Sequence, residues 1–176
     1  MREVPEIQDV AEHALMKQLD STSADHGCVI LMEVKTGFIR AIANLKRRTD
    51  GSYGEDINFA IWESSEPGST FKLASLIALL EDGRIDTNEI VPTGKRSFGK
   101  FEMKDSHEEG YGNISLRRAF EVSSNVAFAT IVSKVFGDRP QSYVNLLKKF
   151  GLGKKLGIEI SGEGEPLIKD ANDRTW

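Results

Sequence analysis

The stretch Glu66-Pro67-Gly68-Ser69-Thr70-Phe71-Lys72 does most to decide the fold and the chemistry expected of this chain. Pro67 and Gly68 form turns, and apolar residues follow at helical spacing: Leu73, Ala74, Ile77 and Leu80. Gly83 stands where the end of a helix favours glycine. The pattern therefore predicts a helix that begins near Ser69, with Ser69 and Lys72 on one face of its first turn.

Ser69 and Lys72 have the residue types needed for nucleophilic catalysis. A serine hydroxyl is a poor nucleophile until a base removes its proton. A lysine can be that base when burial and nearby charge lower its pKa toward neutrality. The positive end of the helix dipole and the amide of Ser69 would face an oxyanion formed on the attacked carbonyl. The pair indicates a site with Ser69 as nucleophile and Lys72 as base.

The spacing Ser-x-x-Lys is weak evidence by itself, because roughly one such pair is expected by chance in a chain of this composition. A second copy does occur, at Ser97-Phe98-Gly99-Lys100. Gly99 and the lack of a helical period predict a loop there, in which nothing would hold the two side chains together. We therefore assign the chemistry to Ser69 and Lys72.

Ser123-Ser124-Asn125 is the natural partner of this pair. It falls at the joint between two predicted helices, one from Ser115 through Val122 and one from Val126 to Phe136. A second hydroxyl can relay a proton, and a carboxamide can hold both a substrate amide and the lysine. A serine pair between helices is often only a cap. The position of Ser123-Ser124-Asn125 between two helices nevertheless favours a catalytic role for Ser123 and a substrate-binding role for Asn125.

The remaining patterns predict an α+β fold. Within the region around the motifs, the segment from Arg84 to Gly112 is expected to be an irregular connection with at most a short strand. In the last part of the chain, Leu156 to Ile160 is expected to be a short extended piece, and the tail to have no core of its own. The expected elements are, in chain order, a helix over 5–20, a β-hairpin over 27–45 with Lys35-Thr36-Gly37 as its turn, a surface loop over 46–66, a helical region over 67–150 and an extended tail over 151–176.

Length and composition narrow the class of protein. The chain has 176 residues, about one domain's worth, with 39% hydrophobic and 28% charged residues, which excludes disordered and fibrous classes. A net charge of −4 gives no electrostatic footprint for nucleic acid. The longest nearly apolar run, Leu73 to Leu80, is too short to cross a bilayer, and the N-terminus has no secretory signal. The single cysteine, Cys28, precedes apolar residues Val29 to Met32 that are expected in the core.

Asp105 and His107 precede Ser123 and invite a Ser-His-Asp interpretation. The histidines fall at predicted loop or helix-face positions, so we expect Asp105 and His107 to be solvated polar residues. No metal-ligand spacing is present in the sequence.

Taken together, these motifs resemble the transpeptidase domain of class B penicillin-binding proteins, whose motif set is Ser-x-x-Lys, Ser-x-Asn and Lys-Thr-Gly. Residues Met32 to Gly37, followed by Ile39 and Ala41, resemble the first β-hairpin of that family, and Gly151 to Glu163 resembles the segment after its helical subdomain. The resemblance covers nearly the whole chain. It is strongest to the division-specific, septal enzyme.

The resemblance implies a partial transpeptidase fold of the serine β-lactamase type, made of an N-terminal helix, a β-hairpin and a helical subdomain. The chain departs from the family in one respect: its only Lys-Thr-Gly, at Lys35-Thr36-Gly37, precedes Ser69, whereas the family's triplet follows Ser-x-Asn. We assign this triplet to a hairpin turn. The third motif and the remaining strands of the sheet are therefore expected beyond Trp176, so that residues 1–176 would be the N-terminal part of the domain, without the family's membrane anchor and pedestal.

By the same resemblance, the parent protein would be a peptidoglycan D,D-transpeptidase that cross-links stem peptides in septal cell-wall synthesis. Ser69 would attack the penultimate D-alanine carbonyl to form an acyl-serine intermediate, Lys72 would take its proton, Ser123 would relay protons and Asn125 would orient the substrate. β-Lactam antibiotics would acylate Ser69, and no cofactor is implied. The parent would be anchored in the inner membrane with its catalytic domain in the periplasm, beside membrane proteins of the divisome.

Two alternatives remain open. A D,D-carboxypeptidase or a β-lactamase-like hydrolase shares the same motifs but hands the acyl group to water. A catalytically inactive fragment is the other, because the third motif is not found after Ser123.

An aliphatic strand such as Cys28 to Val34, paired on one side only, would also be expected to let the chain self-associate through its edge.

Overall fold

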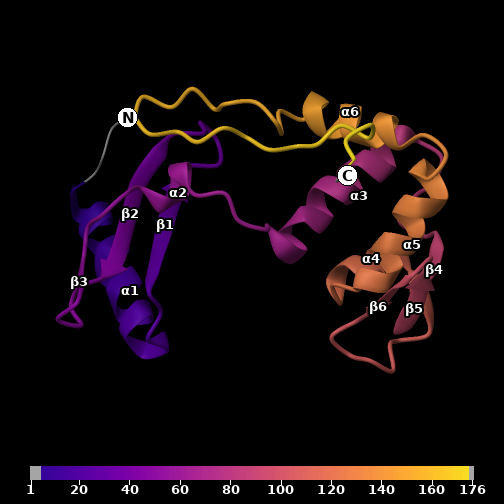
Figure 1. Ribbon diagram of the computed structural model, residues 1–176, viewed down its shortest axis with the longest axis horizontal. Coiled ribbons are helices and arrows are strands. Elements are labelled where there is room, and N and C mark those ends of the chain that lie inside the picture. The colour runs from indigo at the N-terminus through magenta and orange to yellow at the C-terminus, as the bar shows by residue number, and fades with distance from the viewer. Residues whose placement is uncertain (1–4, 175–176) are drawn as a thin grey trace. The chain divides into compact units, whose positions relative to one another are not determined.

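The computed structural model describes residues 5–174, which form an α+β fold (Figure 1). These residues divide into two compact units. The first unit comprises residues up to Ser65 together with Lys155–Glu165, and the second comprises Glu66–Lys154 together with residues from Pro166 onward. Each unit has its own cluster of buried hydrophobic side chains.

The first unit packs one helix on a small antiparallel sheet. Leu15 and Leu19 lie four residues apart on α1, so they share a face, and they pack against Ala43 and Leu45 of β2, which lie two residues apart on one face of the strand. The elements are α1 (Pro5–Thr22), β1 (His26–Met32), β2 (Ile39–Arg47) and β3 (Tyr53–Gly54), and the strand order is β1-β2-β3. The Tyr53 hydroxyl donates to the carbonyl of Ala24 at 2.6 Å, which ties β3 to the end of α1.

Lys35-Thr36-Gly37 lies in the turn between β1 and β2. The Gly37 amide donates to the carbonyl of Glu33 at 2.8 Å, and Gly37 has φ of +73°, which glycine adopts at low cost. The Thr36 hydroxyl donates to the Glu33 carboxylate at 2.7 Å. The Gly37 amide and the Thr36 hydroxyl therefore stabilise the turn.

Strand β1 lies at the edge of the sheet and pairs with β2. Its residues Ile30, Leu31 and Met32 are 45%, 47% and 55% exposed, and Cys28 is exposed as well. The expectation that Val29 to Met32 would be core is therefore wrong for Ile30, Leu31 and Met32. The physical reason is that α1 packs on β2 and on β1 only as far as Val29, and leaves Ile30 to Met32 of the edge strand uncovered.

The segment over 46–66 holds more structure than the expected surface loop. It contains β3 and a short helix, α2 (Phe59–Trp62). The Phe59 ring is buried and stacks on His26 at a centroid distance of 4.2 Å. β3 and α2 have only two and four residues, so neither shows a periodic pattern in the sequence. α2 also depends on the contact of Phe59 with His26, which lies far away in the sequence.

The second unit is mainly helical. Its elements are the 3₁₀ turn η1 (Gly68–Thr70), α3 (Phe71–Asp82), α4 (Leu116–Glu121), α5 (Asn125–Phe136) and α6 (Pro140–Lys149). Its core joins side chains of α3, α4, α5 and strand β4 (Ile90–Pro92); the buried members are Leu79, Val91, Leu116, Ala119, Ala127, Phe128, Ile131, Val135 and Phe136. This core holds α3 and the α4–α5 joint, the two places where the motifs lie.

Four short strands occupy the segment from Arg84 to Gly112 and the residues just after it. β4 pairs with β7 (Asn113–Ser115), and β5 (Lys95–Phe98) pairs with β6 (Phe101–Lys104), both antiparallel. The expectation of an irregular connection with at most a short strand is therefore wrong in the amount of strand, since β4, β5 and β6 all lie in this segment. Strands of three or four residues are too short to show alternation, so pairing rather than sequence pattern defines them.

Leu156 to Ile160 does not pair into a strand. Within the second unit, Leu167 and Ile168 line an apolar pocket with Phe71 and Leu147. The pocket has a volume of about 440 Å³. Between residues 5 and 174, no helix combines the length and apolar character needed to span a bilayer.

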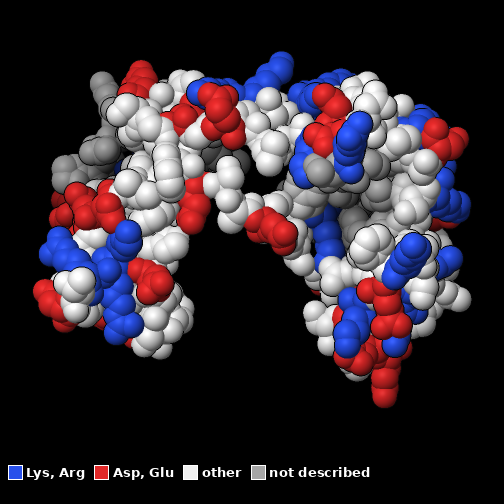
Figure 2. Space-filling view, viewed as in Figure 1, with Lys and Arg blue, Asp and Glu red and all other residues white. Residues whose placement is uncertain are grey.

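Charged side chains of both signs are interspersed on the face shown in Figure 2. Several of them form ion pairs, such as Lys95 with Glu102 at 2.9 Å and Lys104 with Glu108 at 2.6 Å. Exposed pairs of this kind contribute little to stability, because water and salt screen the charges.

Candidate active site

Ser69 lies in the 3₁₀ turn η1 immediately before α3. Gly68 has φ of +57°, a conformation that favours glycine, and the Thr70 hydroxyl donates to the carbonyl of Pro67 at 2.6 Å. Ser69 thus lies at the start of the helix, in a turn that is 3₁₀ rather than α-helical. The difference matters for geometry, because side chains three residues apart eclipse one another in a 3₁₀ turn, which brings Lys72 over Ser69.

The Lys72 ammonium is the centre of the site. It donates to the hydroxyl of Ser69 at 3.1 Å, to the hydroxyl of Ser123 at 2.9 Å and to the carbonyl of Ser123 at 2.7 Å. An ammonium has three N–H donors, so these three bonds use its full capacity. Residues separated by more than fifty positions are thus brought together around one nitrogen.

Burial lowers the pKa of the Lys72 ammonium, and the negative charge of Asp105 raises it in part, so that the pKa lies below its ordinary value. Partial burial disfavours the charged form of a lysine. The neutral amine is therefore populated at a lower pH than for an exposed lysine, which is the property a general base requires.

Ser123 has an unusual backbone conformation, with φ of +55°. It ends α4 in a Schellman motif: its amide donates to Phe120 at 3.0 Å, and the Ser124 amide donates to Ala119 at 2.9 Å. Glycine is the usual residue here, and a serine costs about 1 kcal/mol of strain. This strained conformation turns both the carbonyl and the hydroxyl of Ser123 toward Lys72.

Ser124 begins α5 as its N-cap. Its hydroxyl oxygen accepts from the Ala127 amide at 3.0 Å and donates to the Asp105 carboxylate at 2.8 Å. Ser124 is 1% exposed. The end of α4 and the start of α5 thus share one joint, at which Ser123 is exposed and Ser124 is buried.

Asp105 is 5% exposed, so the expectation that it would be solvated is wrong. Its carboxylate accepts from the amide of Gly94 at 2.7 Å and from the amide of Val126 at 3.0 Å, besides the Ser124 hydroxyl. Burial raises the pKa of Asp105, but these hydrogen bonds outweigh it and hold the pKa below its ordinary value. Sequence reasoning missed the burial of Asp105, because that burial depends on how β6 meets α5.

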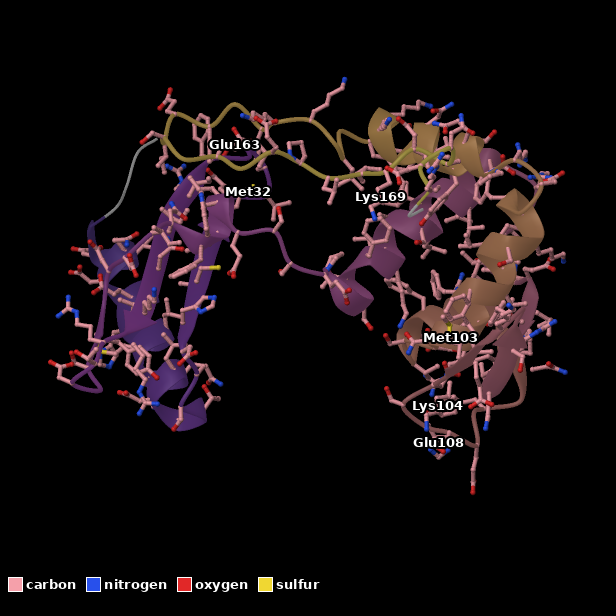
Figure 3. The ribbon with its side chains drawn as sticks, in the orientation of Figure 1. Met32, Met103, Lys104, Glu108, Glu163 and Lys169 are labelled. Atoms are coloured by element: carbon pink, nitrogen blue, oxygen red, sulfur yellow. The ribbon has the colours of Figure 1, made fainter. Side chains whose placement is uncertain are left out.

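Asn125 is the first residue of α5 and lies next to this network. Its side-chain amide donates to the carbonyl of Lys104, at the end of β6, at 3.4 Å. Figure 3 labels Lys104 and Glu108, which form an exposed ion pair at this end of the hairpin. The carboxamide is thus turned toward β6.

The structure keeps the other candidates apart from the site. Ser97 lies on β5, where it pairs with Glu102, and Lys100 lies in the turn between β5 and β6. The His107 ring packs against Tyr111 at a centroid distance of 5.2 Å. In the part of the chain from residue 5 to 174, no group of three or more His, Cys, Asp and Glu side chains is arranged to hold a metal ion.

A comparison with family models gives one match, to the penicillin-binding protein transpeptidase domain, over residues 27–173. Among curated proteins, the chain is 27% identical over 173 residues to the penicillin-binding protein PbpB of Mycobacterium tuberculosis, covering 93% of this chain and 25% of that protein. It is 29% identical over 167 residues to the peptidoglycan D,D-transpeptidase FtsI of Escherichia coli, covering 92% and 27%. The chain thus spans about a quarter of the length of these relatives.

Solved structures give the same fold. A peptidoglycan synthetase from Bifidobacterium adolescentis superposes with a TM-score of 0.81 at 23% identity, covering 99% of this chain and 32% of that one. The transpeptidase domain of penicillin-binding protein 3 from Burkholderia pseudomallei superposes with a TM-score of 0.78 at 20% identity, covering 95% and 46%. These likenesses confirm the expected α+β fold.

Proposed function

This chain belongs to the penicillin-binding protein transpeptidase family, and on that basis we propose that it carries the acylation site of a peptidoglycan D,D-transpeptidase, with Ser69 as nucleophile. The single observation that supports this most is the position of the Lys72 nitrogen, 3.1 Å from the Ser69 hydroxyl and 2.9 Å from the Ser123 hydroxyl. The three groups are the nucleophile, base and proton relay that acyl transfer to a serine requires.

The first half-reaction forms an acyl-serine. A neutral Lys72 keeps two N–H donors, which suit the carbonyl and hydroxyl of Ser123, and its lone pair then accepts the proton of Ser69. Ser69 attacks the penultimate D-alanine carbonyl of a stem peptide, and the Ser69 amide, at the positive end of α3, stabilises the oxyanion. Ser123 passes the proton to the nitrogen of the leaving D-alanine, while Asn125 orients the substrate amide.

The second half-reaction sets the type of enzyme. The amine of a neighbouring stem peptide attacks the ester and regenerates Ser69, which gives a cross-link. Water in place of that amine would give a carboxypeptidase or a β-lactamase-like hydrolase, and analysis of the products formed with and without an acceptor amine separates the two. In the whole protein, the site would act in septal cell-wall synthesis in the periplasm, beside membrane proteins of the divisome.

We expect the 176-residue chain by itself to be acylated slowly. Its Lys-Thr-Gly triplet occupies a hairpin turn of the first unit, so it does not supply the strand amide that completes the oxyanion hole in this family. Loss of one oxyanion donor costs about 10² to 10³ in rate. Labelling with a fluorescent penicillin, in parallel with the whole protein, measures this ratio. Rapid and stoichiometric labelling of the 176-residue chain would show that its oxyanion site is already complete.

Self-association of this chain through β1 is a further expectation. β1 is an edge strand with Ile30, Leu31 and Met32 exposed, and such an edge pairs readily with a second copy of itself. Sedimentation velocity should show a reversible dimer at high concentration. Leu31→Lys should restore the monomer, because a lysine on an edge strand opposes pairing.

Val34→Lys is the matched control for this measurement. Val34 is exposed but lies after the end of β1, so its replacement should leave the dimer intact. A strict monomer for the unmodified chain, or equal association of the Leu31→Lys chain, would rule out β1 as the interface.

A further inference from the structure

We propose that Asp105 is a positioning residue, whose carboxylate fixes the α4–α5 joint and thereby aims Ser123 at Lys72. This inference rests on the proposed acylation of Ser69, and it adds a residue that lies outside the Ser-x-x-Lys and Ser-x-Asn motifs. The Asp105 carboxylate is buried and accepts from three donors on two separate segments.

The first step is the anchoring of α5. Asp105 accepts from the Val126 amide in the first turn of the helix and from the hydroxyl of its N-cap, Ser124. The positive end of the helix dipole favours a negative charge at that place. Asp105 therefore fixes where α5 begins.

The second step connects that anchor to Ser123. Ser123 precedes Ser124 and is held at φ of +55° by the Schellman motif of α4. A strained conformation of this kind persists only when its surroundings over-determine it. The surroundings here are the α4 carbonyls on one side and the fixed Ser124 on the other, so a loosened Ser124 would release Ser123 from Lys72.

The third step concerns the connection before β5. The Gly94 amide donates to the Asp105 carboxylate at 2.7 Å, and the Asp105 amide donates to the Gly94 carbonyl at 2.8 Å. This reciprocal pair holds the β5–β6 hairpin at its open end, next to the Lys104 carbonyl that accepts from Asn125. One carboxylate therefore positions both residues of Ser-x-Asn.

The charge of Asp105 also acts on Lys72, whose pKa it raises against the effect of burial. Other charged groups on the elements packed around Asp105 have partners of their own: Lys104 pairs with Glu108, Lys95 with Glu102 and Lys134 with Glu89. His107 packs on Tyr111. Replacing Asp105 by a neutral residue should therefore lower the pKa of Lys72 further.

The anchor can be tested in the unmodified 176-residue chain by nuclear magnetic resonance. The backbone amides of Gly94 and Val126 should titrate together with the Asp105 carboxyl, at a midpoint below the ordinary value for aspartate. Amides that do not follow the Asp105 carboxyl would overturn the proposal. This measurement needs no variant, so it tests the anchoring role of Asp105 even if substitution at Asp105 prevents folding.

Asp105→Asn tests the coupling to Lys72, with Glu108→Gln as the matched control. An asparagine has one acceptor oxygen and cannot serve all three donors. We expect the Lys72 side chain to titrate at lower pH in the Asp105→Asn chain and at an unchanged pH in the Glu108→Gln chain. An unchanged or raised Lys72 pKa in Asp105→Asn would contradict the inference, since loss of the Asp105 charge and release of the two Ser123 acceptors both disfavour the ammonium form.

In the whole protein, Asp105→Asn should slow penicillin acylation by about 10², the scale of a small misplacement of catalytic groups, and move its pH profile to lower pH. Acylation at the normal rate with an unmoved profile would remove Asp105 from this role. If the unmodified whole protein is not labelled at all, the proposed function fails, whereas the titrations in the 176-residue chain still decide the role of Asp105.

Discussion

Ser69→Ala is expected to abolish acylation of the whole protein by penicillin. The alanine removes the only atom that can form the ester, and removal of the nucleophile from a serine hydrolase costs on the order of 10⁶ in rate. Ser69 is exposed and lies in a 3₁₀ turn, so its replacement should leave the fold intact. Time courses of labelling with a fluorescent penicillin, followed by gel electrophoresis, measure the loss.

Ser97→Ala is the matched control for this experiment, because Ser97 begins the second Ser-x-x-Lys of the chain. Ser97 lies on β5 and should not be acylated in the unmodified protein, so the Ser97→Ala protein should be labelled at the normal rate. Equal labelling of Ser69→Ala and the unmodified protein would remove Ser69 from the role of nucleophile.

Lys72→Ala should slow acylation nearly as much as Ser69→Ala, by about 10⁴ or more. Residues that act as one catalytic unit lose function together rather than additively. The alanine also leaves the Ser123 hydroxyl and carbonyl without the donor that orients them. Lys72→Arg should show a similar loss, because a guanidinium keeps its proton and cannot act as a base.

Lys100→Ala serves as the control for Lys72, since Lys100 lies in the β5–β6 turn. It should leave the rate and its pH dependence unchanged. For the unmodified protein, the rate should rise with pH as Lys72 loses its proton, at a pH below the ordinary range of lysine because the pKa of Lys72 is lowered. A normal rate in Lys72→Ala would assign the base to another residue.

The long periodic segments of the fold could be predicted from the sequence. α1, α3 and α5 each repeat apolar residues at helical spacing, and β1 and β2 flank a glycine turn, so local pattern and tertiary packing agree in these elements. The strands β4 to β7 could not be predicted, since each has three or four residues and forms only through its partner. The exposure of β1 depends on which strand α1 covers, and sequence does not specify that.

The candidate site was predictable in its residue types and spacing. Ser69, Lys72 and Ser123 do lie together, although their catalytic roles remain a proposal. Two features escaped sequence reasoning. The 3₁₀ turn at Ser69 differs from an α-helical turn by a small change in backbone angles, and the burial of Asp105 follows from long-range contacts of β6 with Gly94 and α5.

Mass spectrometry can identify which residue of the protein is acylated. After brief reaction of the whole protein with a β-lactam and digestion with trypsin, fragment spectra locate the added mass within the peptide over 49–72, which holds Ser69 between two cleavage sites. We expect one equivalent of acyl group, as an ester on Ser69. An adduct on Ser97, on Ser123 or on any other residue, with Ser69 unmodified, would contradict it.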